Sequence, residues 1–236
     1  MPASLQNSSV LVIGASSGMG RETALQFARR GANVTAVARR MERLREIEAE
    51  VGLIVEGDAK DPASMERAAA AATEKFGGVD ILIYATGDNI PDRAMSRLTT
   101  EIWDHMIQVN LSGAYYASRA VLPGMRARKA GLLIYISSKS AVIPDESGAS
   151  YQAAKTGLRG LAQAIRVEEK DNGIRTCVVY PGLTNTEIIL KRPVKTPDET
   201  LAKALQASDV AELVVSIATL PARTWVPEVH LFPAGL

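Results

Sequence analysis

Two residues four positions apart, Tyr151 and Lys155, have the side chains needed to move a proton. Residues at i and i+4 share one face of a helix, so a helix here brings the phenol and the ammonium together. A nearby ammonium predicts a tyrosine pKa below the usual value of about 10, and a group that exchanges a proton with a carbonyl or alcohol oxygen. Ser137 and Ser138 come shortly before, and a serine hydroxyl can hydrogen-bond a developing oxyanion. Taken singly, each residue also fits ordinary helix packing or a solvated charge.

A glycine-rich turn, Gly14-Ala15-Ser16-Ser17-Gly18-Met19-Gly20, follows an apolar run and leads into a helix-like stretch. Such a strand–turn–helix unit aims backbone N–H groups and a helix N-terminus at a negatively charged group. Glycine suits positions where the backbone turns tightly or lets a pyrophosphate approach. No Lys-Ser/Thr pair follows, which excludes the phosphate loop of ATPases. The turn predicts a nucleotide site with contacts from Gly14, Ser16, Ser17, Gly18, Met19 and Gly20.

The residues at the end of the second expected strand help to distinguish an NAD(H) site from an NADP(H) site. They include Arg39 and Arg40 and no acidic residue that would hydrogen-bond the ribose hydroxyls of NAD. Guanidinium groups match a 2′-phosphate by charge and by bidentate geometry, so the sequence favours NADP(H) over NAD(H). A solvated start of the next helix is the other explanation of these arginines. Asp58, followed by Ala59, is placed to meet the adenine edge, although a turn or N-cap role fits nearly as well.

These residues require a scaffold, and short apolar runs alternate with amphipathic stretches along the chain. The runs lack period-2 alternation, which is typical of strands buried on both faces of a parallel sheet. The expected strands are Val10–Ile13, Val34–Ala38, Leu53–Val55, Ile81–Tyr84, Leu132–Ile136, Thr176–Tyr180 and Val229–Phe232. The expected helices are Met19–Arg30, Glu42–Glu50, Pro62–Lys75, Glu101–Asn110, Ala114–Arg128, Tyr151–Asp171 and Asp209–Leu220. This predicts an α/β fold, a Rossmann-type doubly wound, seven-stranded parallel sheet flanked by helices.

Charge and cysteine content exclude several classes of protein. The 236 residues carry 27 basic and 26 acidic side chains, so the net charge of +1 lacks the bulk positive charge of a nucleic-acid or anionic-membrane binder. Cys177 is the one cysteine, and two histidines far apart in sequence argue against a structural metal site. The N-terminal segment lacks signal-peptide features, and no apolar run reaches the ~18–20 residues of a membrane span. A cytoplasmic protein with no metal, nucleic-acid or membrane partner is expected.

In chain order, the motifs resemble those of the short-chain dehydrogenase/reductase family, in its compact single-domain branch. The glycine turn, Asp58, Asn110, Ser138, Tyr151-x3-Lys155, and Pro181-Gly182 followed by Thr186 cover essentially the whole chain. The resemblance implies a catalytic tetrad in which Tyr151 is the acid/base and Ser138 steadies the substrate oxygen. It implies that Lys155 lowers the tyrosine pKa and holds the nicotinamide ribose, while Asn110 holds a relay water. It also implies that the cofactor is bordered by Ala85, Gly87, Pro181, Gly182, Thr184 and Thr186.

Two positions depart from the family pattern. Members usually carry Asn-Asn-Ala-Gly after the fourth strand, where this chain has Tyr84-Ala85-Thr86-Gly87, and a threonine where it has Ile13. Both positions help tie the first strand to the fourth in the family. We therefore expect a compensating apolar contact between Ile13 and Tyr84.

One NADP(H)-binding domain over residues 1–236 is expected, with a substrate lid at about 187–200. The pocket is expected between this lid and residues 139–150, with Val142 and Ile143 as apolar contacts. Lys191, Arg192 and Lys195 make the lid basic, which favours a carboxylate, phosphate or thioester-linked substrate. The loop after the fourth strand adds Asp88, Asn89 and Arg93. A solvated mobile loop explains the same charges.

The leading interpretation is an NADP(H)-dependent oxidoreductase that interconverts a small ketone or aldehyde and an alcohol by hydride transfer. The resemblance implies a homodimer or homotetramer. Two alternatives stay open: a 3-oxoacyl-thioester reductase of the same family, and a redox-silent NADP(H)-binding protein.

Overall fold

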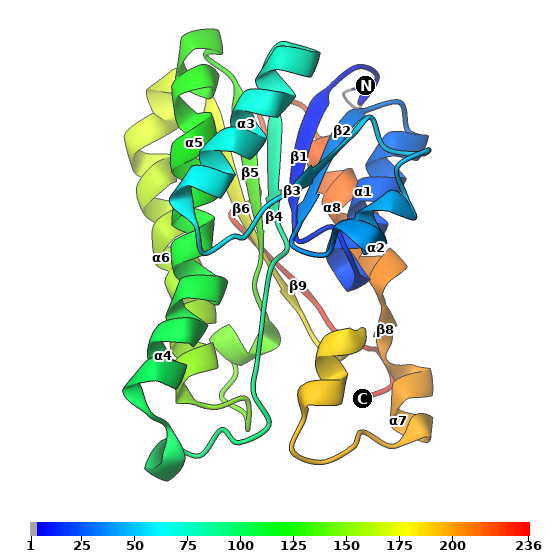
Figure 1. The fold of residues 1–236 in the computed structure, drawn as a ribbon, viewed down its shortest axis with the longest axis vertical. Helices are drawn as coiled ribbons and strands as arrows, with labels where there is room; N and C mark the ends of the chain where they lie inside the picture. The colour runs from blue at the N-terminus through cyan, green and yellow to red at the C-terminus, as the bar shows by residue number, and fades with distance from the viewer. Residues whose placement is uncertain (1–3) are drawn as a thin grey trace.

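Seven parallel strands form the central sheet of the computed structural model, which describes residues 4–236. Their order is β3-β2-β1-β4-β5-β6-β9, which confirms the predicted Rossmann-type, doubly wound arrangement (Figure 1). The strands are β1 (Ser9–Ile13), β2 (Asn33–Ala38), β3 (Leu53–Glu56), β4 (Ile81–Tyr84), β5 (Gly131–Ile136), β6 (Ile174–Pro181) and β9 (Glu228–Leu231).

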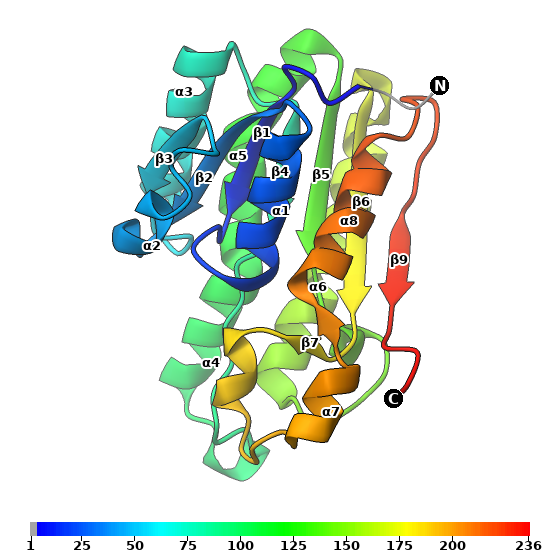
Figure 2. The same ribbon diagram turned by 90° about the vertical axis from the view of Figure 1, so that its right-hand side faces the viewer.

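Helices cover both faces of this sheet (Figures 1 and 2). α1 (Gly18–Arg29) and α8 (Ala207–Ala218) pack together on one face. The other face carries α3 (Pro62–Phe76), α5 (Gly113–Arg128) and α6 (Ala149–Glu169). The sheet is therefore the middle of three layers.

Successive residues of β1 alternate between the two cores on either side of the sheet. Val10 and Val12 belong to the core on the α1 and α8 side, while Leu11 and Ile13 belong to the core on the α3 and α5 side. Side chains of a strand point to opposite faces in turn, so a strand covered on both faces is apolar at every position. This accounts for the uninterrupted apolar runs in the sequence.

Two helices differ from the predicted elements. α2 (Met41–Arg45) ends before Glu50, because the next N–H groups bond to carbonyls three residues back and the chain turns there to bury Ile47. α4 (Thr100–Ile107) does not end at Asn110 but continues through a π-helical turn, Gln108–Ser112, into α5.

A small ribbon, β7 (Thr184–Asn185) paired with β8 (Leu205–Gln206), and the helix α7 (Asp198–Lys203) were not expected. Two-residue strands are too short to leave a sequence pattern.

The order of the strands reverses between β1 and β4, which is where open α/β sheets bind their ligands. The lid segment, residues 187–200, lies beyond this edge of the sheet, in the lower part of Figure 1. The expectation about an N-terminal leader bears in part on residues 1–3, which lie outside the described residues. Among residues 4–236, no helix combines the length and apolar character needed to cross a membrane.

Candidate active site

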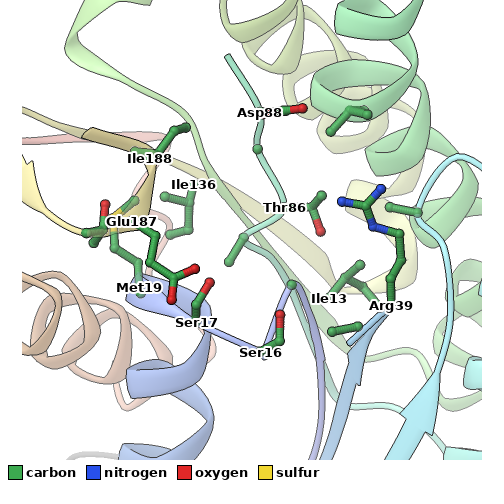
Figure 3. A pocket seen from close by; sticks show the side chains of 18 of the residues that line it. Ile13, Ser16, Ser17, Met19, Arg39, Thr86, Asp88, Ile136, Glu187 and Ile188 are labelled. Atoms are coloured by element: carbon green, nitrogen blue, oxygen red, sulfur yellow. The ribbon is translucent and has the colours of Figure 1, made fainter. Parts of the chain in front are cut away.

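A cavity of about 330 Å³ opens at the carboxyl ends of β1, β2 and β4 (Figure 3). Gly14 has φ +94°, and a Cβ on Gly20 would lie 2.3 Å from the carbonyl oxygen of Gly14, so the turn requires glycine at both positions. This cradle fits a dinucleotide phosphate, because glycine at these two positions lets the backbone turn tightly at the start of the helix. The predicted cofactor residues that line the cavity are Gly14, Ser16, Ser17, Gly18, Met19, Arg39, Arg40, Asp58, Ala59, Ala85, Gly87, Tyr151, Lys155 and Thr186.

Gly20 was also expected to contact the cofactor, and that contact stays a prediction. Gly20 is buried and lies outside the lining of the cavity. It packs against Gly14, so it is needed for the tightness of the turn.

Arg40 crosses the glycine turn from the end of β2. Its Nη2 donates to Ser17 Oγ at 2.7 Å and to Ser16 Oγ at 3.1 Å. Its Nη1 donates to the carboxylate of Glu187 at 3.0 Å, and Arg43 lies 3.5 Å from the same carboxylate. Arg39 is exposed and lies among the side chains that line the cavity (Figure 3). Both arginines therefore border the cavity, and their contact with a 2′-phosphate stays a prediction.

Asp58 has the turn role that was weighed against adenine binding. Its Oδ1 accepts a hydrogen bond from the backbone N–H of Lys60 at 2.9 Å. The side chain also borders the cavity, so the turn leaves it beside the space where an adenine would lie.

Ile13 and Tyr84 are direct neighbours in the pairing of β1 with β4, and both are buried in the same core. The expected apolar contact across these strands is supported. The Tyr84 hydroxyl donates to the carbonyl oxygen of Val109 at 2.5 Å, which ties β4 to the π-helical turn. Burial raises the pKa of Tyr84 far above its ordinary value, so this hydroxyl remains a donor.

Asn110 lies within the π-helical turn and is fully buried. Its Oδ1 accepts from the N–H of Asp88 at 3.1 Å, and its Nδ2 donates to the carbonyl of Asp88 at 3.0 Å. Asn110 thus clamps the chain that follows Gly87. The Asp88 carboxylate pairs in turn with His105 at 3.1 Å and with Lys191 of the lid.

Tyr151 and Lys155 lie in the first turns of α6 and are both buried. Lys155 Nζ is 5.8 Å from the centre of the Tyr151 ring and donates to the carbonyl of Ile136 at 3.0 Å. A Cβ on Gly87 would lie 3.2 Å from Lys155 Nζ and 3.3 Å from Asn110 Oδ1, so glycine lets the lysine and asparagine approach from both sides.

Burial controls the protonation of this pair. It lowers the pKa of Lys155 to about 8. It raises the pKa of Tyr151 above its ordinary value, and the nearby Ser138 hydroxyl lowers that pKa only in part. That Lys155 lowers the tyrosine pKa stays a prediction; in this structure the net shift is upward because loss of water around the phenol outweighs the contacts with Ser138 and Arg93, which lower the pKa.

The two candidate serines have different contacts. Ser137 Oγ donates to the backbone carbonyl of Lys155 at 2.9 Å and so is used within the scaffold. Ser138 Oγ donates to Ser140 Oγ at 3.2 Å and accepts from the N–H of Ser140 at 3.2 Å, and it lies near enough to Tyr151 to lower the pKa of the phenol. The position expected from the family spacing is thus the one beside the phenol.

A second cavity of about 150 Å³ adjoins the first, and Tyr151, Met19 and Thr186 line both. Ser138, Pro181, Gly182 and Thr184 line the second cavity only. The expected apolar contacts Val142 and Ile143 are wrong: they are 37% and 45% exposed and lie outside its lining. The same loop instead contributes Ser140, Asp145 and Ser147.

A family model described as short chain dehydrogenase matches residues 8–195. The chain belongs to the short-chain dehydrogenase family. It is 31% identical to the NADP-dependent 3-hydroxy acid dehydrogenase YdfG of Escherichia coli strain K12 over 233 residues, which are 95% of this chain and 94% of the relative.

Solved structures agree with this membership. The closed form of a serine dehydrogenase complexed with NADP+ is 32% identical, with a TM-score of 0.86 over 94% of each chain. An alcohol dehydrogenase from the archaeon Thermococcus sibiricus, complexed with 5-hydroxy-NADP, is 26% identical, with a TM-score of 0.86 over 97% of each chain.

Sequence reasoning missed the partner of Arg40 in this short-chain dehydrogenase. Glu187, at the start of the lid, lines the nucleotide cavity and pairs with Arg40 and Arg43 across it. The signal was an acidic residue at the start of the lid, shortly before the basic Lys191 and Arg192, but nothing local indicated its partners, because Arg40 lies 147 positions away in the sequence.

Proposed function

We propose that this short-chain dehydrogenase uses NADP(H) to interconvert a small carbonyl compound and its alcohol by hydride transfer. One observation carries the proposal: Tyr151 lines both the nucleotide cavity and the adjoining second cavity. A proton donor at this junction faces a nucleotide on one side and a small molecule on the other. Arg39 and Arg40 at the first cavity favour the 2′-phosphate, and the NADP named for the relatives supports the same cofactor.

When bound, the nicotinamide supplies or accepts the hydride. Tyr151 donates a proton to the substrate oxygen as the carbonyl is reduced, and takes it back in the other direction. Ser138, which lines the same cavity as the phenol, holds the same oxygen and stabilises its developing charge. Because burial raises the tyrosine pKa, the neutral, proton-donating form predominates at neutral pH, which suits carbonyl reduction.

Lys155 would hold the nicotinamide ribose, since its ammonium reaches the nucleotide cavity from α6. The glycine turn would hold the pyrophosphate, and Thr186, which packs against Gly18, would lie beside the nicotinamide.

The 3-oxoacyl-thioester alternative is the less favoured one. The second cavity, about 150 Å³ and lined largely by polar and charged residues, is smaller than the roughly 300–1,000 Å³ typical of sites for drug-sized ligands. A small polar substrate suits it better than a long acyl chain. Turnover of acetoacetyl-coenzyme A far above that of small ketones would reverse this order.

The test of the cofactor is a side-by-side titration with NADPH and NADH, following nucleotide fluorescence. We expect tighter binding of NADPH, and we expect Arg39→Ala to weaken it while leaving NADH unchanged. Arg45→Ala is the matched control, because Arg45 is an exposed arginine that does not line the cavity. Equal affinity for both nucleotides, unaffected by Arg39→Ala, would mean that the arginines only face solvent.

The test of the chemistry is Tyr151→Phe, which removes one oxygen atom and keeps the ring. We expect loss of NADPH-dependent reduction across a panel of small ketones and aldehydes, with NADPH affinity retained. A redox-silent nucleotide-binding protein would turn over none of these compounds, and the substitution would change nothing measurable.

A further inference from the structure

The second cavity carries more positive charge than negative. Its charged lining residues are three cations, Arg93, Lys139 and Arg192, and one carboxylate, Asp145. The carboxylate is already engaged within its own loop, because it accepts from Ser140 Oγ at 2.7 Å and from the N–H of Ser147 at 2.9 Å. The cavity beside Tyr151 therefore suits an anion.

Arg93 is held rigidly at this cavity. Its stem packs against the N-terminus of α6, where a Cβ on Gly148 would lie 2.8 Å from the Cβ of Arg93. Its Nε donates to the carbonyl of Ile90 at 2.6 Å, and its Nη2 donates to the carbonyl of Lys191 at 2.8 Å. Two neutral carbonyls fix the orientation of the guanidinium and leave its charge without an ion-pair partner within 4 Å among residues 4–236. Nη1 likewise has no hydrogen-bond acceptor in that part of the chain.

Arg192 reaches the same cavity from the lid. The only hydrogen bond of its side chain to the described residues is from Nη1 to Thr196 Oγ1 at 3.3 Å, and the guanidinium too lacks an ion pair there. Burial, and after it the charge of Arg192, lowers the pKa of Arg93, which reflects two like charges near one another. Such an arrangement is unfavourable in itself, and an anion between the two side chains relieves it.

We propose that Arg93, assisted by Arg192, binds the carboxylate of a small oxo acid, or of the corresponding hydroxy acid, while the carbonyl or hydroxyl carbon lies at Tyr151. This rests on the proposed function and names its substrate class. A planar guanidinium with free N–H groups matches a carboxylate in shape and charge. Because one cavity of about 150 Å³ holds both the phenol and the arginines, only a few bonds separate the carboxylate from the reacting carbon.

The kinetic test compares acetoacetate with methyl acetoacetate, which has the same reacting ketone and no charge, both with saturating NADPH. We expect the acid to be the better substrate by kcat/KM. Charge-assisted hydrogen bonds of roughly 1.5–3 kcal/mol predict that Arg93→Gln lowers kcat/KM for acetoacetate by about 10- to 100-fold and leaves the ester nearly unchanged. Arg93→Lys, which keeps the charge but not the planar fork, is expected to lie between the two.

Arg97→Gln is the matched control. Arg97 follows on the same loop, pairs with Asp92 at 2.7 Å and does not line the cavity, so neither substrate is expected to respond. Unchanged thermal unfolding and NADPH affinity show that the Arg93 variants remain folded. A preference for the ester, or an acid activity that Arg93→Gln and Arg93→Lys leave intact, would overturn the proposal.

A second measurement does not depend on turnover. Butyrate is titrated calorimetrically into the protein saturated with NADP+, with inorganic phosphate as a competing anion. We expect butyrate binding that Arg93→Gln abolishes, that Arg97→Gln preserves and that Tyr151→Phe leaves largely intact. A carboxylate site is contradicted if butyrate does not bind. It is also contradicted if inorganic phosphate binds more tightly than butyrate and displaces it. If butyrate binds but no ketone is reduced, the proposed function has failed and the anion site stands.

Discussion

Replacing Lys155 with methionine is expected to make the protein more stable at neutral pH while abolishing its activity. Lys155 is 3% exposed, and the one hydrogen bond of its ammonium to the described residues goes to the neutral carbonyl of Ile136. No carboxylate of residues 4–236 lies within 4 Å to compensate its charge. Loss of water around the ammonium is the cause that lowers its pKa from 10.5 to about 8.

The size of the effect follows from this difference in pKa. Below pH 8 the lysine is protonated in both the folded and the unfolded chain, and the folded chain carries the full cost of the buried charge. A difference of about 2.5 pH units corresponds to roughly 3 kcal/mol. The cost falls as the pH rises from 8 to 10.5, where the folded state loses its proton first, and it vanishes above 10.5. Losing the hydrogen bond to Ile136 offsets about 1 kcal/mol, so Lys155→Met is expected to gain about 2 kcal/mol at pH 7.

Urea unfolding of both proteins at pH 7 and at pH 10, without added nucleotide, measures this difference. We expect Lys155→Met to raise the midpoint at pH 7 and to lose that advantage at pH 10. Lys170→Met is the control, because Lys170 is exposed and its substitution gives no pH-dependent difference. A variant less stable than the parent at pH 7, or a difference independent of pH, would refute the idea that the ammonium is poorly solvated in the fold.

Three other substitutions or reactions follow from single contacts. Glu187→Gln releases Arg40 from its ion pair, and an exposed ion pair contributes about 0.2–1 kcal/mol. The Kd for NADPH is therefore expected to fall roughly 2- to 5-fold, with no change in the Kd for NADH. An equal change for both nucleotides contradicts this. Tyr84→Phe removes the hydrogen bond to the Val109 carbonyl. It is expected to lower the free energy of unfolding by about 1–2 kcal/mol and to reduce kcat. An unchanged urea midpoint would mean that this hydrogen bond does not stabilise the fold. Burial raises the pKa of the Cys177 thiol to about 12, so thiol reagents are expected to modify it at pH 8 only after unfolding, and rapid labelling of the folded protein would show otherwise.

The strands and the placement of Tyr151 and Lys155 on one helix could be predicted because their signals are local. A strand covered on both faces is apolar throughout, as in β1 and β4, and a Tyr-x3-Lys pair needs only one helix to bring its members to the same side. The π-helical turn was not predicted, because the sequence indicated two separate helices, Glu101–Asn110 and Ala114–Arg128, where the structure has one continuous helical path. Val142 and Ile143 were misplaced for a related reason: the loop after β5 bonds through Asp145, and those bonds turn the polar side of the loop inward.

The arginine and lysine side chains around the two cavities differ in whether a carboxylate of the protein pairs with them. At the nucleotide cavity, Arg40 is paired with Glu187, and nearby Lys191 is paired with Asp88. A phosphate that binds Arg40 must displace or share the Glu187 carboxylate, so what it gains from Arg40 is a difference between two ion pairs. At the second cavity, the Arg93 side chain has neutral carbonyls as its only partners among the described residues, so a carboxylate arriving there meets an unpaired charge. A substrate carboxylate is therefore expected to gain more from Arg93 than a 2′-phosphate gains from Arg40.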